Sequence, residues 1–139
     1  MNKLINNLRN INFKNLSSYQ YIFKKFDSPE WKNHVSFDDN NYKKNLVFRN
    51  ENFELFVVCW KPKQKTPIHS HAKNGCIIKM LKGNLTEKLY FNDGSFKKHT
   101  IYKNDVTFID DNIGKHIMEN NSDKNAISMH LYSPPNYKI

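Results

Sequence analysis

The sequence predicts a mainly β domain, a sandwich or barrel of short strands, with a short helical segment at its N-terminus. Two observations predict this fold. From residue 45 onward, β-branched and aromatic runs follow one another at close, regular spacing, with turn residues between them. Before residue 36, apolar residues recur at helical spacing instead. The 139 residues hold no repeat or linker, so we expect one domain over residues 1–139.

The first part of the chain is expected to be helical. Four apolar side chains recur at the spacing of one helix face: Leu4, Ile5, Leu8 and Ile11. A second helix start is marked by Ser28, Pro29 and Glu30, which supply an N-cap, a first-position proline and a first-turn acid. We therefore expect residues 1–41 to form a helical segment that packs on the barrel.

The expected strands are bounded by turn signals. Apolar or alternating runs predict strands at residues 46–48, 53–60, 76–81, 85–91, 97–102, 106–109, 116–120 and 126–132. Residues 61–65 contain a proline and predict a turn, and residues 92–95, which read Asn-Asp-Gly-Ser, predict a hairpin. Pro134 ends the last strand, because proline cannot donate to a sheet.

The chain is basic, with a net charge of +9 and a pI of about 9.5. A protein that binds nucleic acid or an anionic surface would explain this charge. However, only Arg9 and Arg49 among the 22 basic residues are arginine, and proteins that read base edges rely on arginine. The lysines are scattered, and the chain is also rich in asparagine, as an A+T-rich coding sequence would produce. We interpret the charge as compositional and expect no nucleic-acid partner.

The apolar runs and the cysteine count indicate the cellular compartment that we expect for the protein. No apolar run approaches the roughly 20 residues that span a bilayer, and the N-terminus lacks the apolar stretch of a secretory signal. Two cysteines, Cys59 and Cys76, are too few for a disulfide framework. We expect a cytoplasmic monomer with no membrane partner.

The strongest functional signal is the pair His69 and His71. Residues i and i+2 of a strand point to the same face, so both imidazoles can reach one metal ion. A third histidine, His116, follows Gly114 in another β-prone run. Histidine is a common ligand of iron, copper, nickel and zinc. The sequence therefore predicts a metal site built by three histidines from two strands.

The spacing around the pair fits the first motif of the cupins. That motif reads His-x-His, four residues, usually a glutamate, six residues and a glycine; the glutamate position here holds Cys76. The second motif is matched by Gly114, His116 and Asn120. The chain thus resembles a cupin, a double-stranded β-helix or jelly-roll barrel. One departure is Lys63, where the first motif usually has glycine.

The missing glutamate changes the chemistry of the predicted site. A 2-His-1-carboxylate triad suits Fe(II) oxygenases, but Cys76 takes the carboxylate position here. With three neutral imidazoles, a metal keeps its full +2 charge and an open face. That face favours an anionic donor such as a thiolate and leaves a position for O₂. Cys76 could also be a ligand itself.

The last predicted strand carries a polar row. Ser128, His130 and Tyr132 lie at i, i+2 and i+4 and share one face, while Met129 and Leu131 take the opposite, apolar face. An edge strand with one solvated face would give the same pattern. Beside a metal site in a barrel, we favour a hydrogen-bonded row that lines a cavity.

Several ordered motifs together resemble cysteine dioxygenase. They are Cys59-Trp60, Ile68-His69-Ser70-His71, Cys76, residues 81–87, Ile113-Gly114-Lys115-His116 and residues 128–135. The resemblance covers residues 42–135, and residues 1–41 match only in helical character. It implies a mononuclear non-haem Fe(II) held by His69, His71 and His116. It also implies that L-cysteine chelates the iron through thiolate and amine, and that O₂ adds both oxygen atoms to sulfur to give cysteine sulfinate.

The resemblance also assigns roles beside the iron. Animal-type members carry a thioether cross-link at the positions of Cys76 and Tyr132; a buried free thiol is the alternative for Cys76. Tyr132 would orient oxygen or substrate, and His130 and Ser128 would hold its hydroxyl. We thus expect Tyr132, His130, Ser128 and Cys76 to be the catalytic residues.

The expected substrate-binding residues are Tyr42 and Lys44. The family binds the substrate carboxylate with an arginine two residues after a tyrosine, and Lys44 occupies that arginine position. Arginine offers a planar fork, whereas lysine offers a point charge, so the departure bears on substrate identity. Arg49 is a weaker substitute, and Ser70 replaces a usual aspartate but points away from its neighbours.

These features predict a thiol dioxygenase that acts on L-cysteine and O₂. Within the same class, the substrate could be another small thiol such as 3-mercaptopropionate or cysteamine. From a different class, the chain could be a non-catalytic cupin that binds a metal.

Overall fold

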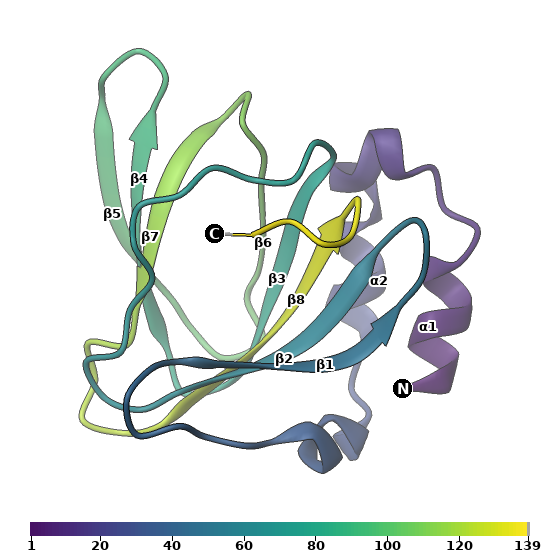
Figure 1. Ribbon diagram of the computed structural model, residues 1–139, viewed down its shortest axis with the longest axis horizontal. Helices are drawn as coiled ribbons and strands as arrows, with labels where there is room; N and C mark the ends of the chain where they lie inside the picture. Colours follow the sequence, from purple (N-terminus) through teal and green to yellow (C-terminus); the bar gives the residue numbers. More distant parts are fainter. Residues whose placement is uncertain (139) are drawn as a thin grey trace.

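The computed structural model describes residues 1–138 and arranges their strands as two antiparallel sheets that face each other (Figure 1). The larger sheet has five strands in the order β1-β2-β8-β3-β6, and the smaller has three in the order β5-β4-β7. The strands are β1 Lys43–Arg49, β2 Glu54–Trp60, β3 Gly75–Lys82, β4 Leu85–Phe91, β5 Phe96–Ile101, β6 Val106–Ile109, β7 Gly114–Glu119 and β8 Ala126–Ser133. Each predicted strand is present, with bounds shifted by a few residues.

The predicted helical segment consists of four short pieces rather than continuous helix. They are α1 Asn2–Leu8, the 3₁₀ helix η1 Phe13–Tyr19, α2 Gln20–Lys25 and the 3₁₀ helix η2 Pro29–His34. The Asn12 side chain caps η1 by accepting from the Lys14 amide, and Asn15 leaves helical backbone angles inside it. Ile11 therefore lies beyond the end of α1, although it still packs on the core. Ser28 caps η2 as predicted, by accepting from the Glu30 amide.

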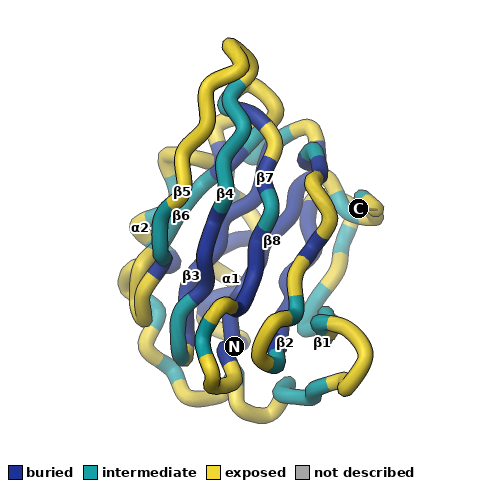
Figure 2. The backbone as a smooth tube through the Cα atoms, turned by 90° about the vertical axis from the view of Figure 1, so that its left-hand side faces the viewer, coloured by how far each residue is buried: buried dark blue, intermediate teal, exposed yellow. Residues whose placement is uncertain are grey.

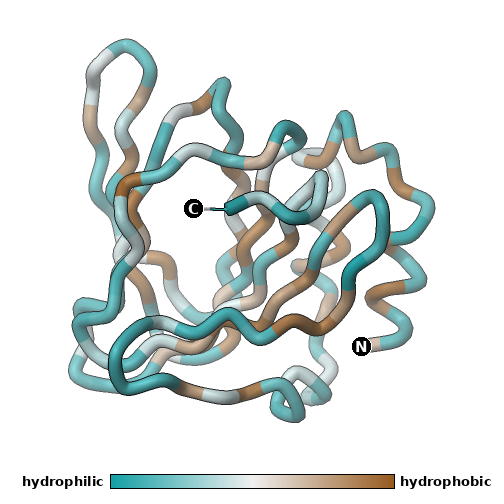
Figure 3. Tube along the Cα trace, in the orientation of Figure 1, coloured by the Kyte–Doolittle hydropathy of each residue, from teal (hydrophilic) through white to brown (hydrophobic). Residues whose placement is uncertain are grey.

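The three central strands of the five-stranded sheet, β2, β8 and β3, are buried on both faces. One face packs against the helical segment, where Leu8, Leu16 and Phe23 meet the apolar side chains of β2, β3 and β8. The other face looks into the barrel toward the three-stranded sheet. Figure 2 shows β3 and β8 as buried along most of their length, and Figure 3 shows hydrophobic residues gathered in these strands. The larger sheet therefore separates the barrel interior from the helices.

Strand β8 lies at the centre of the larger sheet. It pairs with β2, where Tyr132 is opposite Glu54, and with β3, where Tyr132 is opposite Cys76. Met129 and Leu131 take the face opposite the polar row, as predicted, and this face is the one that packs against the helices. The register therefore brings Cys76 and Tyr132 side by side on the barrel face.

Two turns match signals in the sequence. The hairpin between β4 and β5 projects from the barrel, and its tip is exposed (Figures 1 and 2). In the turn after β2, Lys63 has a φ of 72°, in the left-handed region that favours glycine. The glycine usual at this motif position would adopt that angle without strain.

The segment of His69 and His71 departs from the prediction. It is not a regular strand: His69 forms only an isolated bridge with His116 of β7, through backbone hydrogen bonds of 3.1 and 3.2 Å. Pro67, which has no amide hydrogen, precedes the bridge. The pairing with β7 is nevertheless enough to place the segment beside His116.

No helix within residues 1–138 is long and apolar enough to cross a membrane.

Candidate metal centre

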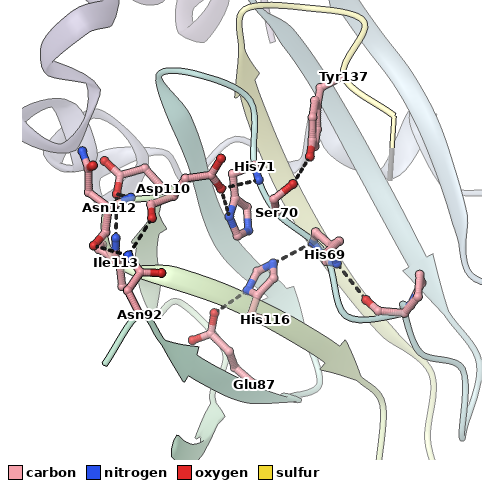
Figure 4. A network of polar contacts seen from close by, with 12 residues as sticks. His69, Ser70, His71, Glu87, Asn92, Asp110, Asn112, Ile113, His116 and Tyr137 are labelled. Carbon is pink, nitrogen blue, oxygen red and sulfur yellow. Dashed lines mark hydrogen bonds and ion pairs between the residues drawn. The ribbon is translucent and has the colours of Figure 1, made fainter. Parts of the chain in front are cut away.

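Three histidine side chains converge inside the barrel. His69 and His71 come from the loop before β3, and His116 comes from β7 (Figure 4). Their ring centroids lie 4.5 to 5.3 Å apart, and one nitrogen of each ring lies within 4.8 Å of the others. All three are buried, at 8%, 4% and 2% exposure. Across residues 1–138, no other group of potential ligands converges in this way.

Two of the rings have their tautomers set by neighbours. His69 Nδ1 donates to the Pro67 carbonyl at 2.9 Å, and His116 Nδ1 donates to Glu87 Oε2 at 2.7 Å. Each Nε2 is then left with a lone pair, and the two Nε2 atoms face each other at 2.9 Å. Two acceptors cannot satisfy each other. A metal ion bound by both nitrogens would satisfy both lone pairs.

The third ring is held by its backbone. The His71 amide donates to Asp111 Oδ1 at 2.7 Å, while His71 Nδ1 lies 3.5 Å from the same oxygen. Neither ring nitrogen of His71 makes a hydrogen bond, although both are buried. Such orphaned polar atoms are costly in a folded protein. Asp111 is itself held by Asn92, whose side-chain amide donates to the Asp111 carbonyl at 3.0 Å.

The surroundings keep His69 and His71 neutral. Burial, followed by repulsion from His116, lowers the pKa of His69 to about 4. Burial, with repulsion from His116 and His69, lowers the pKa of His71 to about 3. A neutral imidazole is the form that binds a metal. The donor set therefore fits a borderline divalent metal that accepts three nitrogen ligands.

Cys76 is buried beside the cluster but does not join it. The thiol is 1% exposed, and burial raises its pKa well above the usual range. Its sulfur is not among the ligand atoms that converge in the cluster, which come from the three histidines. Cys59, the other cysteine, lies on the helix side of the sheet.

The polar row on β8 is a continuous chain of hydrogen bonds. Trp60 Nε1 donates to Ser128 Oγ at 3.0 Å, Ser128 Oγ lies 2.7 Å from His130 Nε2, and His130 Nδ1 lies 3.1 Å from the Tyr132 hydroxyl. The indole can only donate, so the Ser128 hydroxyl accepts from Trp60, and the directions of the next two bonds depend on which nitrogen of His130 carries the proton. Burial lowers the pKa of His130 and raises the pKa of Tyr132, so both stay neutral.

Lys44 and Tyr42 line the cavity beside the histidines. The Lys44 ammonium lies 4.6 Å from the centroid of the Phe56 ring and 5.0 Å from that of Tyr132. Tyr42 stacks on Trp60 at 4.9 Å. Burial lowers the pKa of Lys44, although nearby Glu54 opposes the shift. The remaining space is small, about 10 Å³ open to the centre of a water molecule, which is room for about one water.

The structure brings together the residues expected from the sequence and adds others. Glu87 and Asp111 hold two of the three histidines, and the sequence had singled out neither. Ser70 points away from the cluster and contacts the Tyr137 hydroxyl (Figure 4). Arg49 is paired with Glu54 at 2.8 Å and does not line the cavity.

Comparison with known sequences identifies relatives over most of the chain. Residues 3–139 match the family model described as "Cysteine dioxygenase type I". Cysteine dioxygenase type 1 of Rattus norvegicus is 36% identical over 134 residues, and that of Danio rerio is 32% identical over 133 residues. Each comparison covers 87% of this chain but 66% of the relative, just under two thirds of its length.

Comparison with solved structures supports the fold. The protein TT1209 from Thermus thermophilus superposes with a TM-score of 0.66 and 16% identity, covering 78% of this chain and 98% of that one. A Klebsiella pneumoniae protein with a double-stranded β-helix domain superposes with a TM-score of 0.65 and 15% identity, covering 82% and 93%. The predicted cupin fold is thereby confirmed.

Proposed function

The chain belongs to the cysteine dioxygenase type I family, and from this premise we propose that it is an Fe(II)-dependent thiol dioxygenase that converts L-cysteine to cysteine sulfinate. The observation that carries the proposal is the buried cluster of His69, His71 and His116, with two lone pairs facing each other beside the polar row of β8. The reaction balances as one thiol plus one O₂ giving one sulfinic acid, so the thiol supplies all the electrons. Bound iron would supply the redox chemistry that lets O₂ react with a thiolate.

The residues around the cluster have distinct roles in this proposal. Lys44 offers a positive charge to the substrate carboxylate, and Tyr42 forms the wall of the cavity next to Trp60. Tyr132 presents its hydroxyl to a substrate or oxygen atom in the cavity. His130 and Ser128 hold that hydroxyl in place, since each is locked by the hydrogen bond before it.

We further propose a thioether bond between Cys76 and Tyr132. The two residues are directly opposite in the β3–β8 register and share the barrel face. Forming the bond removes one hydrogen from the Cys76 sulfur and one from the Tyr132 ring, and O₂ takes up the two electrons. Intact mass after turnover with cysteine and O₂ is expected to show a species lighter by two hydrogens. Cys76→Ser removes that species, whereas the matched control Cys59→Ser keeps it; an unmodified wild-type mass would count against the bond.

The proposal is tested with a thiol panel. The protein is loaded with Fe(II), and O₂ uptake and product mass are measured with cysteine, 3-mercaptopropionate and cysteamine. Uptake that yields the sulfinate, is lost in His69→Ala and persists in His34→Ala supports a three-histidine dioxygenase. Absence of thiol-dependent uptake across the panel, with metal still bound, favours the non-catalytic metal-binding cupin.

Lys44 is the reason to include other thiols. A lysine lacks the two-point fork of arginine, so it discriminates less among carboxylate-bearing thiols. If 3-mercaptopropionate is turned over with a higher kcat/KM than cysteine, the physiological substrate class shifts to mercapto acids while the reaction stays the same.

A further inference from the structure

A chain of hydrogen bonds leads from the histidine cluster to the β5 edge of the three-stranded sheet. His116 Nδ1 lies 2.7 Å from Glu87 Oε2, and Glu87 Oε1 lies 2.6 Å from His99 Nε2. The three residues occupy the three strands of this sheet in spatial order, with His116 on β7, Glu87 on β4 and His99 on β5. Glu87 is 3% exposed, whereas the His99 side chain is 32% exposed.

The hydrogen bonds have only one possible direction at the carboxylate. Each oxygen of the buried Glu87 carboxylate faces one ring nitrogen, and a carboxylate can only accept. His116 donates from Nδ1 and His99 donates from Nε2, one to each oxygen. Both carboxylate oxygens are thus satisfied inside the sheet.

His99 is placed to reach Glu87 by strand pairing. Residues 87 and 99 are direct partners in the β4–β5 ladder, so their side chains stand on the same face of the sheet. On its outer side, His99 borders a shallow groove of about 410 Å³ that also contacts Thr100, Asp105 and Thr107. His99 therefore connects this groove to the buried carboxylate.

We propose that His99 is a positioning residue of the metal centre, acting on His116 through Glu87. The proposal rests on the proposed metal-binding function of the three histidines. By holding Oε1, His99 fixes the rotation of the Glu87 carboxylate, so that Oε2 stays in line with His116 Nδ1. That bond in turn aims His116 Nε2 at the metal. Without His99, Oε1 loses this hydrogen bond, and the carboxylate can rotate away from His116.

The competing explanation is an ordinary ion pair at the edge of the sheet. Such pairs contribute about 0–1 kcal/mol to stability and would leave metal binding unchanged. The two explanations differ in what a change at His99 does to metal affinity, which is measurable without turnover.

The experiment titrates metal-free protein with Co(II) and follows its visible absorption bands. His99→Leu removes the donor and is expected to weaken Co(II) binding about tenfold, at the lower end of the range for loss of such a partner. His99→Gln keeps an N–H donor near the position of Nε2 and is expected to recover affinity to within about threefold of wild type. The matched control is His34→Leu, a half-buried histidine for which the structure records no side-chain hydrogen bond, and it should bind as wild type.

A double-mutant cycle separates transmission through Glu87 from any other effect. In a Glu87→Ala background, His99→Leu is expected to cause no further loss of Co(II) affinity. Equal affinity of His99→Leu and wild type overturns the proposal, as does an undiminished His99→Leu effect in the Glu87→Ala background. Urea unfolding checks that each variant is folded, and His99→Val replaces His99→Leu if the latter is not.

The experiment distinguishes a failure of the proposed metal centre from a failure of the proposed role of His99. If wild type does not bind Co(II), or if binding survives His69→Ala, the three-histidine site itself is wrong and the role of His99 falls with it. If wild type binds and His69→Ala does not, the result for His99 stands alone.

Discussion

The histidines of the cluster owe their lone pairs and unpaired nitrogens to particular neighbours. A carbonyl, a carboxylate and burial leave His69 and His116 with lone pairs directed at each other, and His71 with two unpaired nitrogens. The metal-free protein therefore carries an energetic cost that metal binding would relieve.

The first prediction concerns pH. In the folded protein the pKa of His69 is about 4 and the pKa of His71 is about 3, against 6.5 for an ordinary histidine. Below pH 6.5 the unfolded chain binds protons that the folded one does not, so stability falls as pH drops from about 6.5 toward 4. Urea unfolding with a chelator present should show that the free energy of unfolding falls by about 1.4 kcal/mol per pH unit for each titrating histidine. His71→Gln should flatten this slope, His34→Gln should not, and a flat wild-type profile would contradict the assignment.

The second prediction concerns Lys44. Lys44→Met removes the cation beside Phe56 and Tyr132 and is expected to lower kcat/KM about 10- to 100-fold for thiols that carry a carboxylate, because a charge-assisted contact is lost. Cysteamine has no carboxylate and should be turned over as by wild type. Steady-state O₂ uptake with each thiol measures the difference. Equal losses on all three thiols would show that Lys44 does not bind the carboxylate.

The site residues that the sequence predicts have a recognisable local spacing, and those that it misses have none. His69 and His71 are two apart, and Ser128, His130 and Tyr132 alternate along one strand, so local spacing reveals them. Glu87 has no such signature, because its partners come from two neighbouring strands. A lone acid in an alternating strand looks like a solvated residue until the pairing of β4 with β5 and β7 is known.

At the scale of elements, the approach of β7 to β4 depends on one glycine. Gly114 starts β7 with a φ of 152°, and a Cβ there would collide with the Tyr90 carbonyl. Gly94, at the tip of the β4–β5 hairpin, also has a positive φ of 88° but has open space around it. Comparing the two positions separates steric crowding from backbone preference.

The third prediction uses this pair. Gly114→Ala is expected to destabilise the protein by at least about 1 kcal/mol more than Gly94→Ala, because only the former must push strands apart. It should also weaken metal binding, since His116 lies two residues further along β7. Urea unfolding and Co(II) titration provide the two readings. Similar behaviour of the two variants would mean that β7 can shift without cost.

The strands could be predicted better than the helices for a physical reason. Each strand is bounded by turn residues and pairs with a neighbour in one of the two sheets, so the strand that the sequence pattern predicts is the one that forms. In the helical segment, the apolar pattern reports burial on the sheet, while Asn12 and Asn15 divide the backbone by local hydrogen bonding and geometry. The pattern therefore predicted which residues are buried but not where each helix ends.

At the scale of the whole molecule, the helical layer and the outer face of the five-stranded sheet share one hydrophobic cluster, and the barrel interior has another. Lys79 joins the helical layer to this sheet: it is 4% exposed on β3, and its ammonium donates to the carbonyls of Phe23, at 2.9 Å, and Phe26, at the end of α2. We propose that residues 1–41 and the barrel unfold as one unit.

The last prediction tests that unit. Lys79→Met leaves the two carbonyls without a donor and is expected to lower the free energy of unfolding by about 1–3 kcal/mol, with a single transition retained. Lys82→Met, on the exposed end of the same strand, is the control and should change stability by less than about 0.5 kcal/mol. Circular dichroism and tryptophan fluorescence must report coincident curves. Separate transitions for the two probes would show that the helical layer unfolds independently.

The two-sided character of β8 has a consequence for how the chain finds its fold. A slip of one residue in its pairing would place the polar side chains of β8 in the apolar layer under the helices. It would also place Met129 and Leu131 in the cavity. Each displacement buries side chains among neighbours of the wrong polarity, so a misaligned strand is less stable on both faces of the sheet. The strand that furnishes the reactive surface thus also selects the correct assembly of the sheet, and its amides should be among the slowest to exchange with deuterium.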